Sequence, residues 1–302
     1  MKWFLTRLLA GAAAVAVVLV GIGVLLAAQY SGKPAAWAVS QGTDAVWVDS
    51  ADDADALRAL LDTGAVDTVY LFAGKIDAEG GVSATDDLRP LVEGYPDVRA
   101  LAWLRHATEG SSLLETRFDR EARERLAPSV AGAAEGYAGV HLEIRPVRVN
   151  DPSVPELMDL VHEELPEDAV LSVLAHHVEL APGGRIPSFV MNGEEKYWSK
   201  GYLARVARHA DEVVLPGTDP GMPADAMDGG FTVRQVTESV AALRTRDDMT
   251  IRFGVPSGEQ AATVLAGIRL GMTEAEAPEQ MRLGVSLSDP ADLPLYTAGW
   301  LG

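Results

Sequence analysis

Short runs of apolar residues alternate with amphipathic stretches along most of this chain. The runs are rich in Val, Ile and Leu and are bounded by Gly, Pro or Asp, which is typical of buried strands. Eight of them cover Ala45–Val48, Thr68–Phe72, Val98–Leu104, Val140–Ile144, Val170–Leu174, Glu212–Leu215, Thr250–Val255 and Leu283–Leu287. Between them, apolar residues recur at helical spacing in Asp52–Leu61, Pro155–Leu165, Tyr202–His209, Val233–Leu243 and Gly258–Leu270.

This alternation of strands and helices predicts an α/β fold. Eight near-regular units within residues 43–302 favour a closed, TIM-like (β/α)8 barrel. A doubly wound open sheet is the structural alternative. In a barrel of this kind the active site lies at the carboxyl ends of the strands, so polar residues that follow each run become site candidates.

The first 28 residues have a different pattern. Residues 8–28 carry no charge and follow a basic flank, residues 1–7, with Lys2 and Arg7. About 20 apolar residues can span a bilayer as a helix, and the basic flank is expected on the cytoplasmic side. We predict a transmembrane signal-anchor at 8–28, a linker at 29–42 and an extracytoplasmic barrel, which makes a single-pass protein of the cell membrane. A signal peptide cleaved near Ala27-Ala28 is the alternative.

Composition narrows the possible functions. The chain of 302 residues has 44 acidic against 25 basic side chains, a formal charge of −19, which argues against nucleic acid as a partner. The absence of cysteine excludes disulfides, thiol nucleophiles and Cys-ligated zinc. Neither a phosphate-binding loop nor a dinucleotide fingerprint follows any strand, and we expect no cofactor and no metal.

The most informative stretch is Gly136–Asp151, with the sequence GYAGVHLEIRPVRVND. In a strand, side chains two apart lie on the same face, so His141, Glu143 and Arg145 are predicted to share one face. Three polar groups on one face of an otherwise apolar strand are more typical of a functional site than of an apolar core. Pro146 is expected to end the strand, because proline cannot donate to the ladder.

The segment AGVHLEIRP resembles the fourth strand of family 18 glycoside hydrolases and chitinase-like barrel proteins, whose pattern is roughly D-G-x-D-x-D-x-E. In that family the final Glu is the general acid, and the Asp two before it orients the substrate's acetamido group. Aligned on Gly139, the four acidic positions of the pattern fall on Ala138, His141, Glu143 and Arg145. The resemblance therefore implies a glycoside-hydrolase-like barrel in which an arginine, which cannot deliver a proton, stands in the position of the acid.

Other strand ends supply further candidates. His176 follows the fifth run, Trp198 offers an aromatic ring that could stack on a sugar, and Thr218-Asp219 resembles the Tyr-Asp that ends the family's sixth strand. Asp219 also fits a simple turn, since Gly and Pro surround it. The remaining polar residues at strand ends are Asp49, Lys75, Arg105, His106, His177, Glu259 and Asp289.

Two functional hypotheses remain open. In the first, a membrane-anchored barrel has lost the acid and binds a glycan or cell-wall polymer through Arg145, His141, His176 and Trp198, with Arg145 suited to a carboxylate or phosphate. In the second, the chain is an active glycoside hydrolase that acts on N-acetylated glycans through Glu143, together with Asp219. For Glu143 the alternatives are a general acid whose pKa burial raises, or an ion pair with Arg145. For His141 they are a ligand-binding group or a hydrogen-bonded interior histidine.

Overall fold

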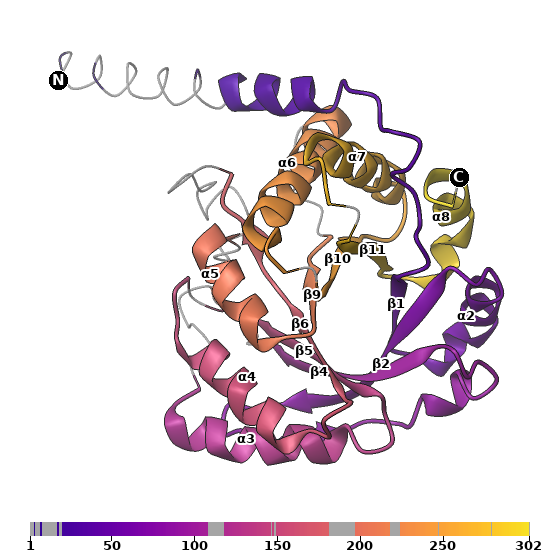
Figure 1. The fold of residues 1–302 in the computed structure, drawn as a ribbon, viewed down its shortest axis with the longest axis vertical. Coiled ribbons are helices and arrows are strands. Elements are labelled where there is room, and N and C mark those ends of the chain that lie inside the picture. The colour runs from indigo at the N-terminus through magenta and orange to yellow at the C-terminus, as the bar shows by residue number, and fades with distance from the viewer. Residues whose placement is uncertain are drawn as a thin grey trace.

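A computed structural model describes residues 20–107, 118–145, 147, 149–180, 197–217, 224–246, 248–278 and 280–301, together with residues 3, 7 and 17. Eight parallel strands form a ring in these ranges (Figure 1). They are β1 (Asp44–Val48), β2 (Val66–Ile76), β4 (Arg99–Ala107), β5 (Gly139–Arg145), β6 (Val170–Leu174), β9 (Glu212–Leu215), β10 (Thr250–Val255) and β11 (Arg282–Leu287). β1 pairs with both β2 and β11, which closes the ring and confirms the predicted barrel.

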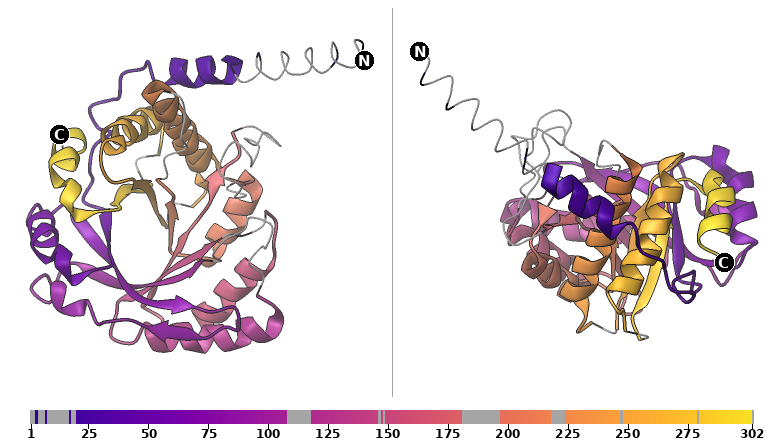
Figure 2. Two further views of the ribbon diagram at one scale, coloured as in Figure 1. Left: turned by 180° about the vertical axis from the view of Figure 1, so that it is seen from behind. Right: turned by 90° about the horizontal axis from the view of Figure 1, so that it is seen from above.

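Helices pack around the outside of this ring, as the views in Figures 1 and 2 show. They are α2 (Ala54–Leu61), α3 (Arg120–Ala133), α4 (Ser153–Glu164), α5 (Lys200–Val206), α6 (Asp225–Leu243), α7 (Gln260–Glu274) and α8 (Leu293–Gly299). Five of the seven overlap the helical segments predicted from periodicity. α3 and α8 were not predicted. α3 buries only two large apolar residues, Leu126 and Val130, beside Ala122 and Ala127, and this gives a weak apolar signal.

Three short strands lie outside the ring. β3 (Val82–Ala84) pairs antiparallel with β2, so it extends the sheet at the point where β2 runs beyond its neighbour β1. β7 (His177–Val178) and β8 (Tyr197–Trp198) form a separate two-stranded sheet. This sheet follows the carboxyl end of β6 and therefore belongs to the same end of the barrel as the predicted site.

The alternation of side chains along the strands separates two apolar layers. Outward residues such as Val46, Leu142 and Ile251 join the large core between the strands and the helices. Inward residues form a smaller cluster that contains Ala45, Tyr70, Leu101, Trp103, Leu174 and Val214. The inner cluster is small because many inward positions are polar or charged, and those positions decide what the barrel can bind.

The carboxyl-terminal helix is held by one buried carboxylate. Asp44, at the start of β1, accepts hydrogen bonds from the Tyr296 hydroxyl (2.7 Å) and from the indole nitrogen of Trp300 (2.9 Å). Its other oxygen accepts the backbone N–H of Val285 on β11 (2.7 Å). Burial raises the pKa of the Asp44 carboxyl, and these hydrogen bonds act against that rise. The arrangement joins α8 to the point where the barrel closes.

The predicted anchor at 8–28 lies largely outside the described residues. Residues 20–29 are helical, and Leu26 packs with Phe231 of α6 and with Tyr197. Within the part of the chain that the structure describes, no helix is long and apolar enough to cross a bilayer. Residues 31–43 contain neither helix nor strand, and Ala38 among them is fully buried, so the predicted linker lies against the domain.

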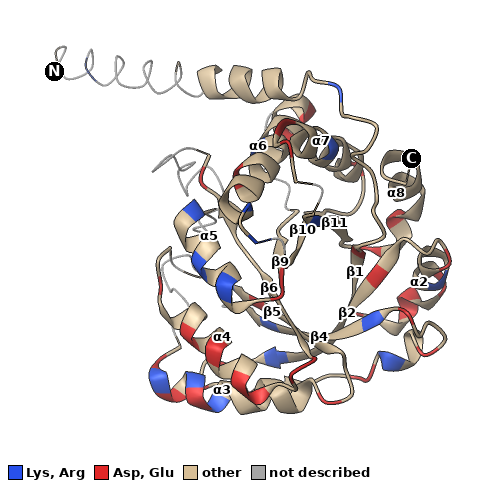
Figure 3. Cartoon of the chain, in the orientation of Figure 1, with Lys and Arg blue, Asp and Glu red and all other residues tan. Residues whose placement is uncertain are grey.

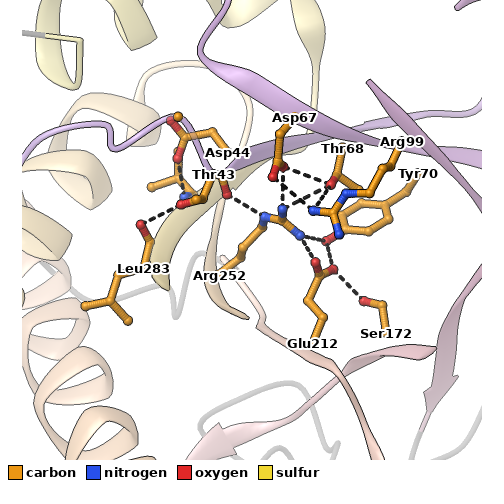
Figure 4. A network of polar contacts seen from close by, with 12 residues as sticks. Thr43, Asp44, Asp67, Thr68, Tyr70, Arg99, Ser172, Glu212, Arg252 and Leu283 are labelled. Carbon is orange, nitrogen blue, oxygen red and sulfur yellow. Dashed lines mark hydrogen bonds and ion pairs between the residues drawn. The ribbon is translucent and has the colours of Figure 1, made fainter. Parts of the chain in front are cut away.

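A charged network fills the amino end of the barrel (Figure 4). Arg252 of β10 is fully buried and forms an ion pair with Glu212 of β9. Its other terminal nitrogen donates to Asp67 (2.6 Å) and Thr68 (3.0 Å) of β2, and its Nε donates to the carbonyl of Thr43 (2.7 Å). One guanidinium therefore bonds groups from two other strands, β9 and β2, and from the segment before β1.

We expect Arg252→Met to lower the free energy of unfolding by about 3–5 kcal/mol, because the substitution leaves the Glu212 carboxylate buried without its cation. Urea denaturation measures this change.

Arg282→Met, which removes an exposed arginine at the start of β11, is the matched control and should change stability little. The double variant Arg252→Met/Glu212→Gln should be less destabilised than the sum of the two single variants. An Arg252→Met variant within about 1 kcal/mol of wild type would show that the network does not hold the barrel together.

Candidate functional site at the carboxyl end of the barrel

The inward face of β5 carries the three polar residues that the sequence singled out. His141 stacks on the ring of Tyr70 across the barrel interior, with ring centroids 4.1 Å apart. Val140, Leu142 and Ile144 point outward into the core beneath the helices. β5 ends at Arg145, the residue before Pro146. His141, Glu143 and Arg145 thus share the interior face, as the alternation predicted.

Glu143 is a buried carboxylate surrounded by donors. Its Oε2 accepts a hydrogen bond from the indole nitrogen of Trp103 on β4, at 2.9 Å. Its Oε1 lies 3.3 Å from Nε of Arg145 and 3.6 Å from Nε of Arg105. The ion pair with Arg145 that the spacing suggested is present, and Arg105 adds a second cation. Each oxygen therefore already faces a donor or a cation, and neither is placed to present a proton to a ligand.

The hydrogen-bond network assigns the tautomer of His141. Ser172 of β6 donates its only hydroxyl hydrogen to Glu212 (2.7 Å), which also accepts from Arg252. The contact between Ser172 Oγ and His141 Nδ1, at 2.7 Å, therefore requires Nδ1 to carry a hydrogen. The Nε2 of His141 is then a bare acceptor, and it has no hydrogen-bond partner among the described residues.

His141 stays uncharged in the folded protein. Burial, and then the charges of Arg252 and Arg145, lower the pKa of this imidazole from 6.5 to about 3. The indole nitrogen of Trp47 on β1 is also buried and lacks a partner in the described ranges, and the rings of Trp47 and His141 have centroids 5.9 Å apart. Two neighbouring rings in the barrel thus offer one free donor and one free acceptor to a small polar group. Of the two interpretations of His141, the geometry supports a hydrogen-bonded interior histidine.

Two further candidates lie against each other: the rings of His176 and Trp198 have centroids 5.2 Å apart. His176 is buried, and its Nε2 accepts the backbone N–H of Val147 at 3.2 Å. Trp198 is 1% exposed and packs edge-on against Tyr202, with ring centroids 4.9 Å apart. A ring buried in this way has no face for a sugar, so the predicted stacking role of Trp198 does not fit the geometry. Asp219 lies outside the described residues.

Two residues that contact Glu143, Arg105 and Trp103, were not foreseen there; Arg105 was expected only as one of the polar residues at strand ends. Both lie on β4, two residues apart, and Arg105 pairs in register with Glu143. The alternation on β4 could have shown that they share a face, but the register between β4 and β5 was needed to place them at Glu143. Within the described ranges, no group of three His, Asp or Glu side chains is arranged to hold a metal ion.

Comparisons with known proteins agree with this fold. No family model matches the sequence, and no curated protein sequence matches it. Solved structures do: the spore cortex-lytic enzyme SleL of Bacillus megaterium QM B1551 has a TM-score of 0.58 at 12% identity and covers 86% of this chain and 74% of its own. SleL of Bacillus cereus gives 0.56 at 12% identity, with 85% and 74% covered. Chitinase ChiC from Aspergillus fumigatus gives 0.50 at 14% identity, with 81% and 91% covered. These likenesses show that the chain has a barrel fold similar to that of these three enzymes, as the resemblance on β5 led us to expect.

The low pKa of His141 makes stability depend on pH. The imidazole of His141 takes up a proton near pH 6.5 in the unfolded chain and only near pH 3 in the folded chain. The stability that the neutral ring contributes is therefore complete above pH 6.5 and is lost as the pH falls from 6.5 to 3. We expect His141→Phe to reduce the slope of unfolding free energy against pH by about 1.4 kcal/mol per pH unit in this window. Urea denaturation between pH 6 and pH 4.5 measures the slope, and His162→Gln, at an exposed position on α4, controls for the loss of a histidine. Identical slopes for wild type and His141→Phe would contradict the assignment.

Proposed function

We propose that this chain is a glycan-binding barrel of glycoside-hydrolase ancestry that does not hydrolyse its ligand. The observation that carries the proposal is the pairing of Arg145 with Glu143, 3.3 Å apart, at the position where the resembled family has its acid. An arginine stays charged at ordinary pH and cannot protonate a glycosidic oxygen. In the part of this barrel end that the structure describes, fixed charges can bind and orient a polar ligand, and the β5 carboxylate, Glu143, is held by cations instead of being placed to donate the proton that bond cleavage needs.

The ligand class follows from the structural neighbours and from the site together. The two SleL proteins are named as spore cortex-lytic enzymes, and ChiC is named as a chitinase. We infer that the ligand is an N-acetylated glycan or a cell-wall polymer that enters at the carboxyl end of the barrel. The alternative is an active hydrolase in which Glu143 donates the proton. The hydrogen bond from Trp103 and the two nearby guanidinium groups weigh against it, because they stabilise the carboxylate as an acceptor.

We expect the full chain to release no reducing ends from chitooligosaccharides or peptidoglycan fragments, and to bind at least one of them saturably. Reducing-sugar assays and isothermal titration calorimetry measure the two properties. Glu143→Gln is compared with Glu124→Gln, an acidic position on the outer helix α3. Turnover by wild type and by Glu124→Gln that disappears in Glu143→Gln would establish a hydrolase that uses Glu143 and would end the binding-only proposal.

We further propose that the domain is held at the outer face of the cell membrane by residues 8–28. The uncharged sequence of this segment supports the proposal, as do the exposed fractions of Val20 (66%), Val24 (63%) and Leu25 (68%). Exposed apolar side chains in a row are stabilised when lipid covers them.

We expect the full chain to remain with the membrane pellet after extraction with alkaline carbonate. A chain that begins at residue 29 should move to the soluble fraction, because it lacks the apolar segment. Mass spectrometry of the exported protein separates an anchor from a cleaved signal, since cleavage would place the mature amino terminus near residue 29. A full chain found in the soluble fraction with its amino terminus intact would contradict the anchor.

A further inference from the structure

The amino-terminal helix, residues 20–29, is docked on the barrel by close backbone contact. Leu26 of this helix is 5% exposed and packs with Phe231 of α6 and with Tyr197 of β8. A Cβ atom on Gly230 of α6 would overlap the backbone oxygen of Leu26, so this approach requires a glycine there. Figure 1 shows the helix beside one end of α6. The helix is therefore part of the folded domain.

The segment after this helix follows α7 back to the start of the barrel. A hydrogen bond joins the side chains of Tyr30 and Thr263, near the beginning of α7. The backbone N–H of Ala35 donates to Oγ1 of Thr273, near the end of α7, at 2.9 Å. Because α7 follows β10, it begins at the carboxyl end of the barrel and ends at the amino end. The chain around Tyr30 therefore lies at the carboxyl end.

The contacts of Leu26 lie at the same end of the barrel. Gly230 is in the second turn of α6, which begins after the carboxyl end of β9. Tyr197 belongs to the two-stranded sheet that follows β6. Glu143 and Arg105 of the candidate site also stand at the carboxyl ends of their strands. The amino-terminal helix and the candidate site thus occupy one end of the barrel.

The docked helix and the proposed anchor at 8–28 share residues. An apolar helix needs about 20 residues to cross the hydrocarbon core of a bilayer, which is about 30 Å thick. Gly23 is the first buried position of the described helix, and residues 8–22 before it would span only about 22 Å. A complete span would therefore include docked residues, none of which is charged (Figure 3). The barrel surface that holds them would then lie at the lipid headgroups.

The same packing favours an anchor that is retained. Cleavage near Ala27-Ala28 would remove Leu26 from its contacts with Phe231 and Tyr197. The apolar surface that Leu26 covers would then face water, which costs free energy. The residues before the cleavage position thus contribute to the packing of the domain.

We propose that the barrel is held with its carboxyl end towards the bilayer and that its ligand is a saccharide attached to a membrane lipid. A saccharide on a lipid is presented at the level of this end of the barrel. Its confinement to the same surface raises its effective concentration, an advantage that a free saccharide lacks. This inference rests on the proposed glycan binding and on the proposed anchor, and it narrows the ligand to lipid-linked glycans.

The orientation is measured by energy transfer from single labelled cysteines to a fluorescent lipid headgroup, with the full chain in phosphatidylcholine vesicles. The chain has no cysteine of its own, so each variant carries one label. Glu259→Cys and Glu274→Cys place exposed labels at the two ends of α7. Glu121→Cys and Glu135→Cys do so for α3, on the far side of the barrel (Figure 1). We expect stronger transfer from the first label of each pair, which lies at the carboxyl end.

A glycine variant connects the orientation to the docked helix. Gly230→Ala should reduce the difference in energy transfer within each pair, because the added methyl group displaces Leu26 and frees the barrel from a fixed orientation. Gly201→Ala, on α5, is the matched control, since its added Cβ would have no atom within 4 Å, and it should retain the difference. Differences that persist unchanged in Gly230→Ala would overturn the role of the docked helix.

The ligand class is measured by competition against a fluorescent chitotetraose that binds the full chain in these vesicles. The competitors are free chitotetraose and chitotetraose attached to a dialkyl lipid. The lipid-linked form is placed either in the vesicles that hold the chain or in separate vesicles. We expect it to compete about tenfold more effectively than the free form when it shares the vesicle, and to lose this advantage in separate vesicles.

Each result decides between the proposals. Stronger transfer from the carboxyl-end labels, together with an advantage within the same vesicle, supports the inference. Equal or reversed transfer, or no advantage for the lipid-linked form, would overturn the inference and leave the anchor and glycan binding in place. A full chain that does not enter vesicles would overturn the anchor and the inference with it. A chain that enters vesicles but binds no saccharide would overturn the glycan-binding function and the ligand inferred here.

Discussion

The barrel depends on a guanidinium group buried at its axis. Arg252 lies between β9 and β2 without exposure to solvent, and its hydrogen bonds satisfy Glu212, Asp67 and Thr68 at once. A closed ring of strands must fill its own interior, and charged groups are tolerated there only when they are paired and hydrogen-bonded. Arg99 adds a second cation on Asp67, so this network pairs two basic side chains with two acidic ones.

The same network reaches toward the opposite end through short contacts. Glu212 takes the hydroxyl hydrogen of Ser172, and Ser172 accepts from His141. The closed end therefore fixes which nitrogen of His141 is protonated, and the charge of Arg252 helps keep the ring neutral. Above His141, Glu143 lies beside two cations, Arg105 and Arg145. The proposed binding belongs to this carboxyl end, where charged side chains reach solvent: that of Arg105 is 49% exposed.

The strands were predictable because their signal is local. Each of the eight runs is apolar over a strand's length, and the alternation in Val140–Ile144 was enough to place His141, Glu143 and Arg145 on one face. The pairing of Arg252 with Glu212 was not predictable, since the two residues are 40 positions apart and meet only when β9 and β10 align. α8 was missed for a related reason: it is short, and its docking depends on the distant Asp44. Trp198 looked like a sugar platform because sequence does not reveal burial.

The spacing of polar residues on β5 resembles that of a family 18 glycoside hydrolase, but their charges differ from the family pattern at the last position, Arg145. In a strand that presents a carboxyl at the position of Arg145, a proton donor would stand at the barrel edge. With arginine there, the remaining carboxylate of Glu143 lies between two guanidinium groups and accepts a hydrogen bond from the Trp103 indole. A substitution of this kind changes the local charge by two units at one position while the barrel around it is unaltered. The proposed binding function requires only fixed charges that orient a ligand, and β5 still carries them, whereas cleavage would also require a mobile proton.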